Sequence, residues 1–134
     1  MNWIATAEAL AAQKLLAPEH LRSIACIYLF VQFIGNTDMH FGNLSFFVDD
    51  VTQPAFVPTP VYDMLPMAWR PGIHGGELEL ASIHPQRQPA GFEAEARQAR
   101  GWAVEFWEKA GQLLALGDSV RDAAVANARG LRQV

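Results

Sequence analysis

The sequence predicts a mainly α-helical domain that contains one small β-hairpin, with residues 1–134 forming a single domain. Apolar residues recur at helical spacing near both ends of the chain, over 7–34 and 92–131. Between them, aromatic and branched residues form short extended runs at 44–48 and 51–62, and prolines in the second run keep its strands short. The length of 134 residues is that of one domain.

Composition narrows the class of protein further. Hydrophobic residues make up 51% and charged residues 18% of the chain, which favours a packed core over disorder. A net charge of −4, with scattered basic residues, argues against a nucleic-acid-binding surface. The single cysteine, Cys26, excludes a disulfide framework and favours a reduced compartment. With no signal-peptide pattern and an apolar run at 24–34 too short to cross a bilayer, we expect a cytoplasmic protein that binds no membrane.

Two helices are expected in the first part of the chain. The first covers 7–16, where Thr6 is placed to cap an alanine- and leucine-rich stretch. The second covers about 18–34, opens with a proline, and is expected to end at Gly35. Because 24–34 is apolar on nearly all sides, this second helix is predicted to be the most buried element.

A small hairpin follows. Residues 44–48 form its first strand, and 51–57 with 60–62 supply the returning extended pieces. Its turn lies away from the polar loop that precedes it, and its two ends carry Asn43 and Asp63.

The last third of the chain begins irregularly and then becomes helical. Residues 66–91 are rich in proline and glycine, with a short extended piece expected at 78–83. From Phe92 the apolar residues recur at alternating spacings of four and three, which predicts a core-facing helix. Gly117 breaks that helix, and Asp118 or Ser119 is expected to cap a final one.

Polar residues between the apolar helix and the hairpin form the candidate site. Asp38, His40 and Asn43 lie on one short loop, and Asp63 follows the returning strand. A carboxylate and an amide oxygen that converge there suit a hard cation such as Mg²⁺, and the other carboxylate is free to accept a proton. Taken singly, Asp38 could cap a helix end and His40 could be a structural histidine. A zinc site formed by His40 and the two aspartates is a chemical rival, which the missing cysteines disfavour.

The string Asp-x-His-x-x-Asn, followed after a hairpin by aspartate, resembles the catalytic core of phosphoinositide-kinase-like and HipA-like kinases. The fuller motifs most resemble the HipA family of bacterial serine/threonine kinases, many of them toxins of toxin–antitoxin pairs. These motifs are Gly35-Asn36-Thr37-Asp38-Met39-His40-Phe41-Gly42-Asn43-Leu44-Ser45 and Val61-Tyr62-Asp63-Met64-Leu65-Pro66. The resemblance implies a helical bundle like a kinase C-terminal lobe, whose hairpin carries the catalytic and metal-binding residues.

The resemblance also implies a role for each polar residue. Asp38 matches the catalytic aspartate, while Asn43 and Asp63 match the residues that hold Mg²⁺ and the ATP phosphates. We expect His40 to hold the loop in place through hydrogen bonds, or to act directly on a phosphate. Here Asp63-Met64-Leu65 stands in the Asp-Phe-Gly position, so the roles of that phenylalanine and glycine do not transfer.

The function implied is transfer of the ATP γ-phosphoryl group to a serine or threonine of a protein. No glycine-rich loop precedes Asp38, and the only lysines are Lys14 and Lys109 on expected helices. We therefore expect the C-terminal portion of a kinase, inactive alone, which binds ATP and Mg²⁺ only with an N-terminal lobe present. We also expect an antitoxin-like protein as a partner, and we expect the chain to self-associate. The alternative is a non-catalytic kinase-lobe remnant that acts as a protein-interaction module.

Overall fold

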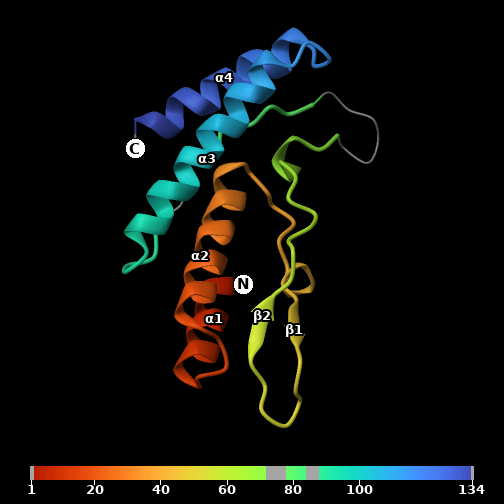
Figure 1. Cartoon of the computed structure of the whole chain (residues 1–134). Helices are drawn as coiled ribbons and strands as arrows, with labels where there is room; N and C mark the ends of the chain where they lie inside the picture. The colour runs from red at the N-terminus through yellow and green to blue at the C-terminus, as the bar shows by residue number, and fades with distance from the viewer. Residues whose placement is uncertain (1, 72–77, 84–87, 134) are drawn as a thin grey trace.

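The computed structural model describes residues 2–71, 78–83 and 88–133. These residues form four α-helices, two short 3₁₀-helices and one two-stranded antiparallel sheet (Figure 1). The prediction of a mainly helical domain with one small hairpin is confirmed. Across the described ranges, no helix is both long and apolar enough to cross a membrane.

Helix α1 spans Trp3–Ala12, so it begins and ends about four residues before the expected helix. The predicted cap, Thr6, is wrong: the Asn2 side chain accepts hydrogen bonds from the backbone N–H groups of Ile4 and Ala5. The helix stops early because the backbone that follows pairs elsewhere. The backbone N–H of Phe56 donates to the carbonyl of Leu15 at 2.8 Å, which draws this segment onto the hairpin.

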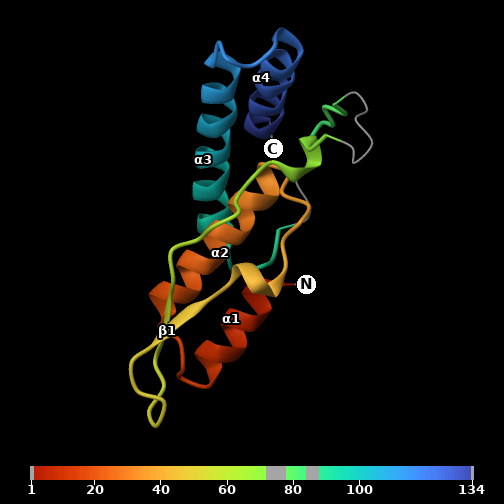
Figure 2. The same ribbon diagram turned by 90° about the vertical axis from the view of Figure 1, so that its right-hand side faces the viewer.

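Helix α2 spans Pro18–Phe33 and is the central element, as Figures 1 and 2 show. It contacts α1, α3 and β2, and it contributes to both hydrophobic clusters of the core. Among the four helices it has the largest share of buried residues, which confirms the prediction for this helix. These residues are Ile24, Ala25, Cys26, Leu29, Val31 and Phe33.

The hairpin pairs β1 (Phe46–Val48) with β2 (Phe56–Pro58), and both strands are shorter than expected. Prolines cannot donate to a strand ladder, so those at 54, 58 and 60 limit the pairing. The Phe46 and Phe56 rings lie 5.5 Å apart and pack toward α1. Phe47 and Val57 pair on the opposite face, where their side chains are exposed.

Helices α3 (Glu93–Gln112) and α4 (Asp118–Arg132) pack on each other, and α3 also packs on α2. The expected apolar stripe on α3 is buried at Ala96, Ala99 and Ala103, partly buried at Phe106 and Ala110, and exposed at its end, Leu113. Trp107, which flanks the stripe, is buried, and its indole N–H donates to the carbonyl of Phe33 at 3.0 Å. The expected cap of α4 is wrong. Gly117 occupies the N-cap position without a side-chain bond, and Asp118 lies in the first turn.

The segment before α3 contains η2 (Met67–Trp69) and no strand within its described residues. The piece at 78–83, which is expected to be extended, forms no strand, and two hydrogen bonds to side chains of other segments hold it. Trp69 donates its indole N–H to the carbonyl of Ala81 at 2.9 Å. The Asn127 side chain accepts from the backbone N–H of Ile83 at 3.1 Å. The rest of the expected irregular stretch, at 72–77 and 84–87, lies outside the described residues.

Candidate active site

The polar loop begins where α2 ends. Gly35 has φ of 75°, a left-handed conformation that favours glycine and ends the helix as expected. Its carbonyl accepts from the backbone N–H of Ala68 at 2.9 Å, which ties the loop to η2. A Cβ atom at this position would lie 2.4 Å from Cδ1 of Ile83. The end of α2 therefore sits in a crowded place that only a glycine fits without strain.

Exposed and partly buried side chains alternate along the extended loop at residues 38–40, so the residues that anchor the loop differ from the candidate catalytic ones. Met39 and Leu44 pack against the cluster formed by α1 and the start of α2. Asp38 and His40, on either side of Met39, are exposed. The Asp38 carboxylate makes no hydrogen bond to another described residue, so the helix-cap interpretation of this side chain has no support. The loop thus presents Asp38 outward from a backbone that is held on the core.

Asn43 is buried and braces the loop. It lies in η1 (Phe41–Asn43), and its side-chain oxygen accepts from the backbone N–H of His40 at 3.1 Å. The His40 carbonyl in turn accepts from the Trp3 indole at 3.3 Å. Tyr62 donates its hydroxyl hydrogen to the carbonyl of Gly42. Because a carboxamide oxygen has two lone pairs, Asn43 keeps one that could face a cation.

Asp63 lies on the extended segment after β2, so Asn43 and Asp63 flank the two strands and neither lies on them. Asp63 has φ of 62°, uncommon for a residue other than glycine and concentrated at functional sites. Its carboxylate is exposed, while the neighbouring Met64 packs against the same cluster as Met39. The two aspartate segments are therefore anchored on one part of the core.

Asn36 joins these two segments directly. Its side-chain N–H donates to the carbonyl of Asp63 at 3.0 Å. Its side-chain oxygen accepts from the backbone N–H of Asp38, also at 3.0 Å. One carboxamide thus bonds the backbones of both aspartates. The sequence motifs assign no role to Asn36, whose signal is a carboxamide immediately after the glycine that ends the helix.

Comparison with known proteins shows the family of this chain. The HipA-like C-terminal domain family matches residues 3–128. The chain belongs to this family. A curated relative, Toxin YjjJ of Escherichia coli (strain K12), is 30% identical over 133 residues. That alignment covers 99% of this chain but 29% of the relative, so the chain spans under a third of the relative's length. No solved structure matches the chain.

Asp63 and Asn43 are the residues of this HipA-like domain that could hold a cation. A carboxylate and a carboxamide oxygen are a donor set that suits Mg²⁺, which commonly takes one or two carboxylates together with waters and substrate phosphates. The described part of the chain holds no group of three or more histidine, cysteine, aspartate or glutamate side chains that could bind a metal. The zinc alternative therefore has no support from these residues.

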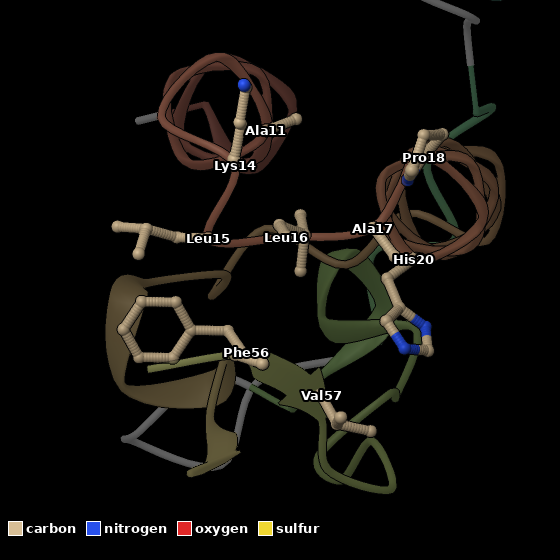
Figure 3. A pocket seen from close by; sticks show the side chains of 10 residues that line it. Ala11, Lys14, Leu15, Leu16, Ala17, Pro18, His20, Phe56 and Val57 are labelled. Carbon is tan, nitrogen blue, oxygen red and sulfur yellow. The ribbon is translucent and has the colours of Figure 1, made fainter. Parts of the chain in front are cut away.

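One cavity of this HipA-like domain lies away from the polar loop. It has a volume of about 410 Å³ and lies where the connection between α1 and α2 meets β2. Figure 3 shows Leu16 above Phe56, with Lys14 and His20 on opposite sides. None of Asp38, His40, Asn43 and Asp63 lines it, so this cavity is not part of the candidate active site.

Proposed function

We propose that this HipA-like domain is the C-terminal catalytic portion of a toxin kinase that transfers the γ-phosphoryl group of ATP to a serine or threonine of a protein. The bonds of Asn36 to both aspartate segments carry the proposal, because they link the backbones of two residues whose side chains are exposed. No bond to a described residue occupies the Asp38 carboxylate. Such a pair suits a reaction in which one carboxylate holds a cation and the other handles a proton.

Each residue then has a distinct task. Asp38 orients the attacking hydroxyl and accepts its proton. Asn43 and Asp63 hold Mg²⁺, which neutralises phosphate charge when bound. His40 keeps Asn43 in place through its backbone bond to the carboxamide. Positioning and charge stabilisation supply most of the catalysis in such reactions.

The proposal includes a second region that covers the nucleotide. The relative named as a toxin is more than three times as long as the aligned segment, which leaves room for such a region. The toxin name of that relative supports a toxin–antitoxin context, in which an antitoxin-like protein is the proposed partner. A cytoplasmic setting is part of the same proposal. ATP and Mg²⁺ are expected to bind well only when the covering region is present, since Mg²⁺ relies on phosphates for much of its binding.

Six large apolar side chains on the segments around the site are exposed, and we expect the covering region to pack on them; we call them the exposed apolar face. Its large side chains are 42–58% exposed, although side chains of this size usually contribute to cores. They come from η1, from the outer face of the hairpin and from the Asp63 segment. They are Phe41, Phe47, Val57, Val61, Tyr62 and Leu65. The same face favours the second candidate function, a non-catalytic module that binds a partner protein.

The two functions are separated by completing the domain with a nucleotide-covering region, either fused or added as a second chain. Transfer of labelled γ-phosphate to serine or threonine, absent from the 134-residue chain alone, is the expected result for a kinase. Tight binding of the covering region without any transfer to protein would instead support the interaction module. Transfer by the 134-residue chain alone would contradict the requirement for a covering region.

A further inference from the structure

A second cavity lies next to the candidate active site and shares only Leu65 with the exposed apolar face described above. Its volume is about 640 Å³, within the range of sites that hold a ligand. Residues 65–67, 69 and 70 form one wall, and the end of α3 with the start of α4 forms the other. We call it the η2–α3 groove.

The floor of the groove is aromatic and has no spare polar groups. Trp69 and Trp107 lie there with ring centroids 4.6 Å apart. Both indole N–H groups are already bonded, to the carbonyls of Ala81 and Phe33. A side chain that enters the groove therefore meets hydrocarbon. Leu65 and Leu113, each 53% exposed, add apolar surface at its edges.

The charged residues of the groove are both cationic. They are Arg70 and Lys109, in a chain whose net charge is −4. Arg70 forms no ion pair with another described residue, and it is exposed. Lys109 pairs with Glu105 at 2.6 Å, but both side chains are well exposed and such a pair contributes little. The groove thus combines an apolar floor with a positive rim.

The groove starts beside the candidate metal ligand. Leu65 lies two residues after Asp63, and its backbone N–H donates to the Asp63 carbonyl at 3.1 Å. Two residues of chain span at most about 7 Å. A polypeptide that places a hydroxyl near Asp63 therefore has the mouth of the groove within reach of its neighbouring residues.

We infer that the η2–α3 groove docks the protein substrate, through a segment that carries leucine-type side chains and carboxylates near the acceptor serine or threonine. The inference rests on the proposed function for the identity of the occupant. Apolar side chains would fill the floor over the two tryptophans, and glutamate or aspartate would face Arg70 and Lys109. An acidic, apolar segment matches the groove in charge as well as in polarity.

Binding to the 134-residue chain tests this directly, without any catalysis. The probe is a short, terminally blocked peptide of serine, leucine and glutamate, titrated while tryptophan fluorescence is recorded. Saturable change is expected, because Trp69 and Trp107 form the floor. A matched peptide with lysine in place of glutamate is expected to bind at least about fivefold more weakly, and one with alanine in place of leucine roughly tenfold or more weakly. Equal binding of all three peptides, or none by any, would overturn the inference.

Two variants and their controls locate the binding. Leu113→Ser is expected to weaken binding roughly tenfold, whereas Leu114→Ser, at a neighbour 84% exposed and outside the groove, should leave it unchanged. Arg70→Glu should shift the preference toward the lysine peptide, while Arg97→Glu, on the exposed face of α3, should not. Concentration-dependent self-association that Leu113→Ser abolishes would show that a second copy fills the groove and would overturn the inference.

Failure of the proposed function and failure of the docking inference would give different results. In the completed protein, Asp38→Ala should abolish transfer and leave peptide binding intact, whereas Leu113→Ser should raise KM for the protein substrate and leave KM for ATP unchanged. If no variant of the completed protein transfers phosphate but the peptide still binds in the groove, the kinase proposal fails and the docking site stands. If transfer occurs with KM unaffected by Leu113→Ser, the docking inference fails alone.

Discussion

Asn36 shows why the site depends on one small side chain. Its partners are the backbone N–H two residues away and a carbonyl 27 residues away. The motif could be read from the sequence, since Asp38, His40, Asn43 and Asp63 stand in a recognisable pattern. The bond between the two aspartate segments could not, because it depends on how the hairpin returns over the end of α2.

Replacing Asn36 tests this bond. Asn36→Ala removes two hydrogen bonds of about 0.5–1.5 kcal/mol each, so we expect it to lower the free energy of unfolding by about 1–2 kcal/mol. Urea unfolding of the 134-residue chain measures it. Thr37→Ala, at the exposed neighbouring position, is the control and should change stability by less than about 0.5 kcal/mol. Equal stability of both variants would argue that Asn36 does not hold the segments together.

Cys26 is expected to be unreactive. Burial raises the pKa of its thiol, and Glu95 nearby raises it further. Since the thiolate is the reactive form, folded protein at pH 8 should be alkylated by iodoacetamide far more slowly than protein unfolded in urea. Mass spectrometry over time gives both rates. Comparable rates in the two states would mean that the thiol is open to solvent.

At the scale of elements, the helices were easier to predict than their ends. The apolar periods at 18–34 and from Phe92 located α2 and α3, because burial on a helix face leaves a repeating pattern. The predicted end of α1 was wrong, because the hydrogen bond between Leu15 and Phe56 after this helix is a tertiary contact. The strands were too long in the prediction since aromatic residues alone do not show where pairing stops.

Gly35 marks the boundary between helix and site, and its replacement should be costly. Gly35→Ala forces a side chain into a left-handed conformation and toward Ile83, so we expect a loss of more than about 1 kcal/mol. Gly101→Ala, inside α3 where a Cβ meets no atom within 4 Å, should instead stabilise by about 0.5–1 kcal/mol. Thermal or urea unfolding compares them. A neutral Gly35→Ala would contradict the assigned helix end.

At the scale of the whole molecule, α2 joins two parts. One side of it packs with α1 and the hairpin, and another side packs with α3 (Figure 2). The polar loop leaves from its end, so the site lies between the two clusters and beside the exposed apolar face. A sequence can show that such residues are apolar, but only the fold shows that they remain uncovered.

The exposed apolar face predicts association. We expect the 134-residue chain to self-associate or to gain stability when a covering region is added. Phe47→Ser, at a side chain 58% exposed on the outer hairpin face, should weaken that association and leave the fold intact. Val51→Ser, 84% exposed at the hairpin turn, is the matched control. Sedimentation of both variants tests this prediction. A chain that stays monomeric and gains no stability from the covering region would refute it.

Phosphoryl transfer by the completed protein, with and without Asp38, is the most informative measurement. Asp38→Ala should lower the rate roughly 10²–10⁴-fold, the usual effect of losing a positioned general base, with unchanged circular dichroism. Asp49→Ala, an exposed aspartate at the start of the hairpin turn, should retain the full rate. Equal transfer by the Asp38→Ala protein and the unaltered protein would contradict the catalytic role proposed for Asp38.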